Sequence, residues 1–400
     1  MNLITTVAQL EAIIGRPPAL VRMKELPELD EACRRMLALA PLAGFGYRDG
    51  DGRPRTTVVG GRPGFAEVES PARIAFDSDA EASGAVSFVF LLPGVGETLR
   101  VNGSVAGRSP GRIVVAVSQA YVHCARAILR SRLWSPIVPP TSAAGPPTPT
   151  ADDDGLLSGA AVADGWLSGA AVADGSLSGA VVPGGPLSSA GVLGFLRATP
   201  FFVVSSWDRD GGGDTSPRGD TPGFVRVIDG HTLAIPDRRG NKRADTSHNL
   251  LADDGFAAAM LVPGRTDVLH VSGTAVVTDD ATLLADMALG SAVPQTALIV
   301  TVERAEVRPN QAVAAANVWD HANRADAATR SELMAATTRQ LGVQKPALRW
   351  LARSLAVFAR PIRRIMDAAY RRALKKEGYD AAPDTPRAAG TGDRPDPGDA

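Results

Sequence analysis

The sequence has little cysteine and no long apolar run, and each of these absences excludes a class of protein. Among 400 residues only Cys33 and Cys124 are cysteines, which excludes a disulfide framework and a cysteine-rich zinc site. The five histidines show no metal-ligand spacing. No stretch of about 18 apolar residues predicts a membrane span, and the beginning of the chain lacks the pattern of a signal peptide. We therefore expect a cytoplasmic protein.

Net charge is equally small, at −1, so the composition does not indicate a nucleic-acid or membrane partner. The chain instead has an excess of glycine and proline, with 41 and 30 residues, which indicates many turns or irregular segments. Apolar residues make up 44% of the sequence, enough to fill hydrophobic cores. For a chain of this length we expect about two or three domains.

Short segments of the chain recur in the same order at constant offsets, which indicates a tandem duplication. Each match keeps a proline, glycine, tryptophan or apolar run, and several ordered blocks are not expected by chance. The matched pairs are Pro63–Phe65 with Pro222–Phe224, Pro93–Gly94 with Pro263–Gly264, Ile113–Val115 with Leu298–Val300, and Trp134 with Trp319.

Both copies carry the pattern of antiparallel β-sheet. Short β-branched or apolar runs alternate with Gly, Pro and Asp turns, and Asp208–Gly211 has the composition of a hairpin turn. Because no long helices separate the runs, an antiparallel barrel is favoured over a parallel sheet. Leu26–Ala40 has apolar residues at helical spacing and predicts a helix before the first barrel. The strands predicted in the second copy are Phe201–Ser205, Phe224–Ile228, Ala257–Val262, Val268–Val277 and Ala297–Val302.

The segment between the copies has a different composition. Residues 139–190 are rich in Pro, Ala, Gly and Ser, and a ten-residue unit that begins at Asp154 recurs from Asp164 and, less regularly, from Asp174. Two interpretations are open, a glycine-punctuated β stack and a flexible linker. We favour the linker, because the unit lacks side chains bulky enough to form a core.

Helical patterns follow the second copy. Ala325–Gln340 and Ala347–Lys376 predict two helices, and Pro361 should kink or break the second. The second helix is strongly basic, which is typical of a solvated face packed on its own domain, or of a surface for nucleic acid or an anionic membrane. We favour the packed face. Because these helices lie outside the repeat, we expect them to be dispensable for ligand binding.

The clearest difference between the copies is a polar insertion in the second. Between Ile235 and Ala257 it carries four cations around a Gly-Asn turn, followed by hydroxyl side chains at the start of a predicted helix. Such a segment suits a phosphate group, although composition alone favours a solvated basic loop. A second change favours phosphate: Arg218 stands on a strand where the first copy has Val59, so the cation and the loop are missing together from the first copy.

At these residues the chain resembles the FMN-dependent, actinobacterial-type members of the pyridoxamine-5′-phosphate-oxidase-like flavoprotein family. The resemblance covers about residues 20–135 and 192–320, and its motifs are specific in combination and weak singly. The segments that carry it are Asp214–Phe224, Ile235–Asn241 and Val262–Gly264 in the second copy, and Leu92–Gly103 and Tyr121–Trp134 in the first.

The resemblance implies a mainly β (α+β) fold of two tandem six-stranded Greek-key split barrels that form an intramolecular pseudo-dimer, followed by C-terminal helices. The corresponding domain boundaries are 1–138, 139–190 for the linker, 191–322, 323–380 for the helical extension, and 381–400 for a disordered tail. It also implies FMN as the cofactor, bound in the cleft between the two copies. The residues implied to hold FMN are Ser216, Arg218, Arg238, Arg239, Asn241, Lys242, Arg243 and Ser247 of the second copy, with His123, Arg130, Ser131 and Trp134 of the first.

The two copies depart from the family in complementary ways. The first copy lacks the cationic insertion but keeps His123 and Arg130, whereas the second keeps the insertion but has Ala315 at the position of Arg130. Because each cleft of a two-fold dimer draws on both halves, we expect one functional flavin site and one degenerate site. A nucleophile–base pair at His123 and Cys124 is disfavoured, because neighbours on an extended strand point to opposite faces.

An FMN-dependent oxidase or reductase of a small organic substrate is the function that we favour. The flavin carries the redox chemistry, so no general acid or base need appear in the sequence. We expect NAD(P)H or O2 as the redox partner, no nucleic-acid partner, and a monomer. The alternative is a non-catalytic flavin-, deazaflavin- or haem-binding protein, such as a sensor. The sequence identifies neither a catalytic residue nor the substrate.

Overall fold

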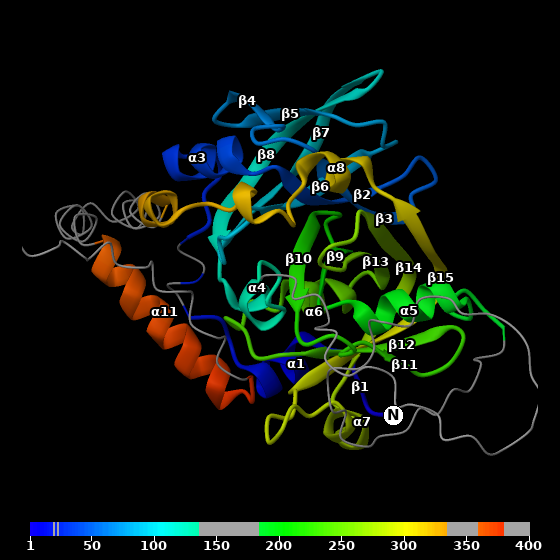
Figure 1. The fold of residues 1–400 in the computed structure, drawn as a ribbon. Coiled ribbons are helices and arrows are strands. Elements are labelled where there is room, and N and C mark those ends of the chain that lie inside the picture. Colours follow the sequence, from blue (N-terminus) through cyan, green and yellow to red (C-terminus); the bar gives the residue numbers. More distant parts are fainter. Residues whose placement is uncertain (19–20, 22–23, 136–183, 334–358, 380–400) are drawn as a thin grey trace, which may run out of the picture.

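The computed structural model describes the chain except residues 19–20, 22–23, 136–183, 334–358 and 380–400. The described part consists of two antiparallel β-sheets, one from each predicted copy, packed against each other with helices at their edges (Figure 1). The mainly β fold predicted from the sequence is thereby confirmed. The ten-residue repeats and the predicted tail lie outside the described residues.

The first sheet has seven strands in the order β3-β2-β6-β7-β8-β5-β4. Its core is dense in aromatic side chains, with the Phe45 and Phe88 rings stacked at 4.8 Å. Helix α3 (Glu31–Leu39) covers this core and is shorter than the predicted helix, because Asp30 caps its beginning and Leu26 forms an isolated bridge with Ala120. The strands are β2 (Leu42–Arg48), β3 (Pro54–Gly60), β4 (Glu67–Ser70), β5 (Arg73–Asp77), β6 (Ser83–Leu91), β7 (Thr98–Ser109) and β8 (Arg112–His123).

The second sheet has eight strands, with seven of them in the order β10-β9-β13-β14-β15-β12-β11. Its apolar face packs under helix α5 (Ala190–Ala198), which Ser189 caps. All five predicted strands are present, although the segment predicted over Phe224–Ile228 pairs only at Arg226–Val227. The strands are β9 (Phe201–Trp207), β10 (Gly213–Gly219), β11 (Arg226–Val227), β12 (Thr232–Asp237), β13 (Gly255–Leu261), β14 (Asp267–Thr278) and β15 (Thr296–Pro309).

The two sheets share one strand order, element for element. A β-bulge occurs at the same place in each, before Gly103 of β7 and before Gly273 of β14. The left-handed turn glycines also correspond, since the pairs Gly52 and Gly211, Gly64 and Gly223, and Gly94 and Gly264 all have φ between 73° and 86°. Two copies of one ancestral unit would be expected to keep the same strand order, bulges and turn glycines.

The first residues of the chain pack on the second sheet and not on the first. Strand β1 (Leu3–Ile4) pairs with β14, and helix α1 (Val7–Ile14) packs beside helix α6 (Asp245–Leu250). Ile4, Leu10 and Ile14 are buried in the core of the second half. The N-terminal segment is therefore structurally part of the second half.

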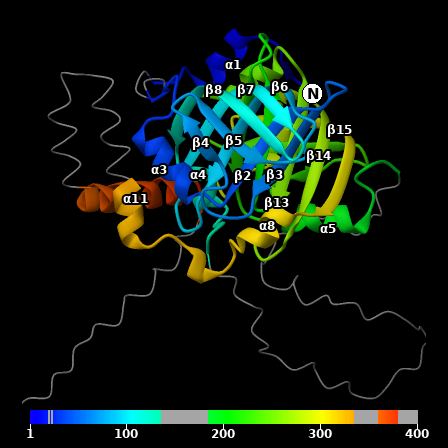
Figure 2. The same cartoon turned by 90° about the horizontal axis from the view of Figure 1, so that it is seen from above.

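The two halves meet through strands β2, β3 and β6 of the first and β9, β10 and β13 of the second. Seen from above, the first sheet lies over the second (Figure 2). Hydroxyl pairs cross this contact: Thr56 donates to Ser205 at 2.8 Å, and Ser87 and Thr215 lie 2.6 Å apart. Gly46 permits the close approach, because a Cβ there would lie 2.1 Å from the Ser205 hydroxyl. Buried apolar residues from both halves surround these pairs, among them Leu42, Val89, Phe201 and Val203.

Each half also supplies a helix to the other. Helix α4 (Arg126–Arg130) of the first half packs on β10 of the second, and helix α8 (Gln311–Ala316) of the second packs on β3 of the first. This reciprocal exchange gives the molecule two related places between its halves. Only one of them carries the cationic insertion.

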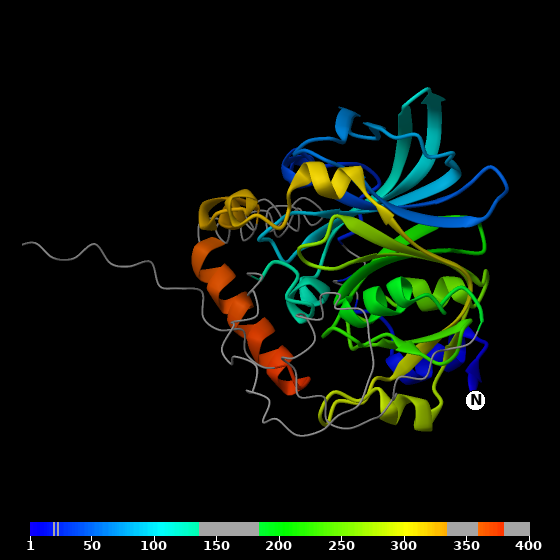
Figure 3. The same ribbon diagram turned by 45° about the vertical axis from the view of Figure 1, so that its right-hand side comes forward.

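The remaining helices lie at the periphery. Helix α7 (Ala281–Asp286) and the 3-10 turn η1 (His321–Asn323) are short, and helix α11 (Ala359–Lys376) runs along one side of the molecule past α4 (Figures 1 and 3). Pro361 lies near the beginning of the described helix α11. The stretch in which the two predicted C-terminal helices would meet lies outside the described residues. Within the described part of the chain, no helix has the length and apolar character needed to cross a membrane.

Candidate functional site

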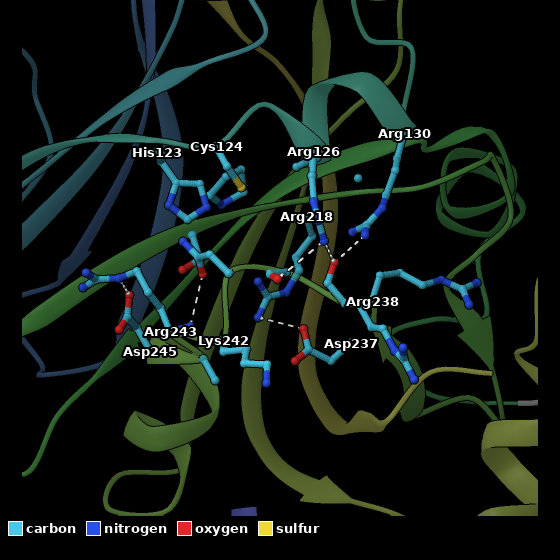
Figure 4. Close-up of a pocket in the computed structure, with 18 of the residues that line it drawn as sticks. His123, Cys124, Arg126, Arg130, Arg218, Asp237, Arg238, Lys242, Arg243 and Asp245 are labelled. Carbon is cyan, nitrogen blue, oxygen red and sulfur yellow. Dashed lines mark hydrogen bonds and ion pairs between the residues drawn. The ribbon is translucent and has the colours of Figure 1, made fainter. Parts of the chain in front are cut away.

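A pocket lies between the two halves where α4 packs on β10 (Figure 4). The first half contributes the end of β8 and helix α4 to its wall. The second half contributes β10 and the connection from β12 to α6, and Ile14 of α1 completes the lining. The described residues contain no cluster of His, Cys, Asp and Glu arranged to hold a metal ion.

The connection from β12 to α6, residues 238–244, is the cationic loop predicted from the sequence. A local turn holds it, since the Asn241 side chain accepts a hydrogen bond from the backbone N–H of Arg243 at 3.1 Å. Lys242 and Ala244 have left-handed backbone conformations, with φ of 64° and 49°. Such conformations are strained for residues other than glycine and are concentrated at ligand sites.

Positive charge dominates the pocket. Among the described residues that line it, only Asp237 and Asp245 have acidic side chains. Such an excess of cations in a concave site attracts anionic ligands. The cationic lining residues are Arg100, Arg126, Arg130, Arg218, Arg238, Arg239, Lys242 and Arg243.

Two arginines of α4 hold the backbone of the cationic loop. Arg126 Nη1 donates to the carbonyl oxygen of Arg239 at 2.9 Å, and Arg130 Nη2 donates to the same oxygen at 2.5 Å. Figure 4 shows both side chains reaching from α4 toward the loop. The first half of the chain thus fixes the position of a loop that belongs to the second half.

A buried ion-pair network forms the inner wall. Arg100 of β7 is 1% exposed and pairs with Asp214 of β10 and, at 3.1 Å, with Asp245 of α6. Arg243 Nε also donates to Asp245 at 2.8 Å and lies over the Tyr121 ring. Burial by itself raises the pKa of Asp245, but the charges of Arg100 and Arg243 outweigh it and bring the pKa to about 2. The network therefore holds the Asp245 carboxylate in its ionised form between the halves.

His123 presents an uncharged ring to the pocket. Burial, together with the neighbouring charge of Arg100, holds the pKa of His123 well below its ordinary value. Strand β8 ends at His123, and Cys124 follows outside the strand, so both residues line the pocket. This differs from the expectation that the two neighbours point to opposite faces of a strand.

The structure brings most of the twelve predicted site residues together. Ser216, Arg218, Arg238, Arg239, Asn241, Lys242, Arg243, His123 and Arg130 all line the pocket. Ser131, Trp134 and Ser247 do not line it. Ser131 donates to the carbonyl of Ile128, and the Trp134 ring packs between the halves and donates to the carbonyl of Val95. Ser247 is fully buried on α6.

Arg100, Arg126 and Asp245 are site residues that were not predicted. Arg126 lies one helical turn before Arg130, so helical spacing was a signal that could have identified it. Arg100 lies inside an apolar strand, and its buried partner Asp214 is far away in the sequence, so no local pattern indicated the pair.

The region where α8 packs on β3 corresponds to the pocket where α4 packs on β10, but its side chains differ in charge. There Val59 corresponds to Arg218, Gln311 to Arg126 and Ala315 to Arg130. His270 corresponds to Arg100, and its ring contacts Thr57 at 3.2 Å. Burial lowers the pKa of His270 to about 4, so this ring is also uncharged. None of these four positions supplies the positive charge found in the pocket.

Known proteins support a family relationship for the second half. Residues 190–319 match the family model described as pyridoxamine 5′-phosphate oxidase. No curated protein matches the chain.

Three of the solved structures with a similar domain each cover 30% of the chain. A variant of HupZ of Group A Streptococcus is 18% identical and covers 30% of this chain and 98% of its own, with a TM-score of 0.26. A protein of Lactobacillus delbrueckii described as a putative pyridoxamine 5′-phosphate oxidase is 17% identical and covers 30% and 92%, with a TM-score of 0.24. General Stress Protein 26 of Bacillus anthracis is 13% identical, with the same two coverages and the same TM-score. Residues 190–319, which carry β10 and the cationic loop, are therefore the part of the chain that is similar to the pyridoxamine 5′-phosphate oxidase family.

Proposed function

We propose that the chain is a flavoprotein that binds one FMN between its two halves and acts as an oxidoreductase on a small organic substrate. The observation that carries this proposal is the pocket, in which the cationic loop of the family-matched half faces α4 of the other half. The proposal includes a tandem duplication with the boundaries predicted from the sequence. One half then takes the place of a second subunit, and the chain acts as a monomer.

The side chains of the loop fit a phosphate group. Arg218, Arg238 and Arg243 are paired with Asp237, Asp220 and Asp245 respectively, which fixes their positions. Arg239 and Lys242 are exposed on the loop. The two exposed cations are therefore placed to meet a phosphate first, and charge-assisted hydrogen bonds from them would hold it.

Buried polar atoms on the inner wall fit the polar ring system of a flavin. His123 Nδ1 and Arg100 Nε are buried and have no hydrogen-bond partner in the described part of the chain. Buried polar groups are nearly always paired, so an unpaired group beside a pocket indicates a bound water or ligand. Both residues line the pocket.

FMN, when bound, supplies the electron-transfer chemistry. The residues of the chain bind and orient it: the cationic loop holds the phosphate, and Arg126 and Arg130 hold the loop. Arg218 places a fixed positive charge beside the pocket, which stabilises negative charge on a reduced ring. His123 offers an uncharged hydrogen-bonding group, because its pKa lies well below neutrality.

The absorption spectrum of the purified protein is the first test of this function. We expect the two bands of oxidised flavin, their loss on anaerobic addition of NAD(P)H, and their return in air. A flavin spectrum that NAD(P)H leaves unchanged would favour a non-catalytic binder or a different reductant. A Soret band or a deazaflavin spectrum, with no FMN binding on titration, would contradict the proposal.

A further inference from the structure

The C-terminal end of helix α11 makes a sharp turn back toward the pocket. Gly378 follows the helix with φ of 87°, Tyr379 N–H donates to the carbonyl of Leu374 at 3.0 Å, and Gly378 N–H donates to that of Lys375 at 3.2 Å. These two bonds define a Schellman motif, which needs glycine at this position. A Cβ on Gly378 would lie 2.7 Å from the carbonyl oxygen of Leu289, so the turn also packs closely against the second half.

This turn brings Tyr379 against a buried carboxylate of the second half. The Tyr379 hydroxyl donates to Asp220 Oδ1 at 2.7 Å, while Arg238 Nε donates to Asp220 Oδ2 at 2.5 Å. Asp220 is fully buried, and Tyr379 is 7% exposed. One carboxylate thus joins the C-terminal turn to the first arginine of the cationic loop.

Glu377 reaches the same loop from its other side. Its Oε2 accepts from Arg130 Nε at 2.9 Å and from Arg130 Nη2 at 2.5 Å. Arg130 in turn donates to the carbonyl oxygen of Arg239. The C-terminal turn is therefore linked to Arg238 through the side chain of Asp220, and to the backbone of Arg239 through the side chain of Arg130. This placement differs from the expectation that the C-terminal helices are dispensable for ligand binding.

We propose that the turn Glu377–Tyr379 is a third component of the site and that Tyr379 is a positioning residue for the cationic loop, acting through Asp220 on Arg238. The inference rests on the proposed function in that the loop binds the phosphate of FMN. The family match ends at residue 319, so this turn lies outside the matched segment. Without the Tyr379 hydroxyl, Asp220 loses one of its hydrogen bonds, and Arg238 is less firmly held.

The test uses Tyr379→Phe in the full chain, because this change removes one oxygen atom. Dissociation constants for FMN and for riboflavin are measured by fluorescence titration. We expect FMN binding to weaken by about fivefold, which corresponds to one hydrogen bond of ordinary strength, and riboflavin binding to stay unchanged. A general loss of packing would weaken both flavins alike, and that result would overturn the proposal. The matched control is Tyr47→Phe in strand β2, remote from the pocket, which should change neither constant.

A double-mutant cycle tests whether Tyr379 acts through Arg238. In the Arg238→Ala background, Tyr379→Phe should have no further effect on FMN binding, since the group that it positions is gone. Additive effects of the two substitutions would overturn the proposed route. An unchanged FMN dissociation constant in Tyr379→Phe itself would overturn the positioning role while leaving the proposed function intact.

Limited proteolysis provides a measurement that does not depend on flavin. Trypsin cleaves after arginine and lysine, and the cationic loop contains four such residues. We expect Tyr379→Phe to be cleaved within residues 238–243 several-fold faster than the unmodified chain. Equal cleavage rates would contradict the positioning role. If the unmodified chain bound no FMN, the proposed function would fail, and these rates would still decide the positional claim.

Discussion

Replacing Arg239 and Lys242 together with alanine is expected to weaken FMN binding by several kcal/mol. Charge-assisted hydrogen bonds to a phosphate contribute about 1.5–3 kcal/mol each, and these two cations are the exposed ones on the loop. The loss should be specific to the phosphate, so riboflavin binding should hardly change. The measurement is a pair of equilibrium titrations, with FMN and with riboflavin.

The control for this double variant removes two positive charges at positions outside the pocket. Arg53 and Arg62 are exposed cations of the first half that do not line the pocket. Their double alanine variant should retain FMN affinity, which separates a local contact from a general change in net charge. Equal FMN retention by the loop variant and the unmodified chain would rule out the loop as the phosphate site.

Removing the buried arginine of the network should cause the largest loss of stability. Arg100→Met leaves Asp214 and Asp245 without their shared cation at a buried contact between the halves. Breaking a buried ion pair from one side costs about 3–5 kcal/mol, because the remaining charge stays desolvated. Urea unfolding, followed by tryptophan fluorescence, should therefore show a large fall in the transition midpoint.

Arg112→Met is the matched control for this prediction. Arg112 pairs with Glu67 at 2.6 Å near the surface of the first half. Water screens such a pair, so the midpoint should stay close to that of the unmodified chain. A midpoint for Arg100→Met as high as that of the control would show that the network contributes little to holding the halves together.

Local sequence patterns correctly predicted the strands and the hairpin turn, because both depend mainly on residues that are neighbours in the chain. Alternating apolar runs identified the strands, and Asp208–Gly211 forms the predicted turn, with Gly211 in a left-handed conformation. Comparison of the two copies located the cationic loop, because an insertion in one copy is visible without any structure. These signals depend on neighbours in the chain or on repetition, both of which a sequence displays directly.

The unpredicted features depend on contacts between distant segments. Strand β1 pairs with β14, which is far away in the sequence, and two residues give no recognisable strand pattern. Tyr379 follows the predicted basic helix at the end of the helical extension, and its role follows only from its contact with the buried Asp220. Arg100 belongs to a strand of the first half, whereas both of its acidic partners belong to the second.

We propose that the pocket beside α4 binds FMN and that the related place beneath α8 has lost the ability to bind it. In the related place beneath α8, Val59, Gln311 and Ala315 stand where Arg218, Arg126 and Arg130 line the pocket. Arg308, which stands there at the position of His123, is exposed and paired with Glu306 at 2.6 Å, so a phosphate would lack the arginines and the loop that line the pocket, which costs several kcal/mol. The second place should therefore not bind FMN at ordinary concentrations.

The stoichiometry of FMN binding tests this claim most directly. Apo-protein is titrated with FMN under conditions in which the protein concentration is far above the dissociation constant, and the ratio is checked on the purified holo form after the flavin is released. We expect saturation at one FMN per chain, and loss of that one equivalent in the Arg239→Ala, Lys242→Ala double variant. Saturation at two FMN per chain would contradict it.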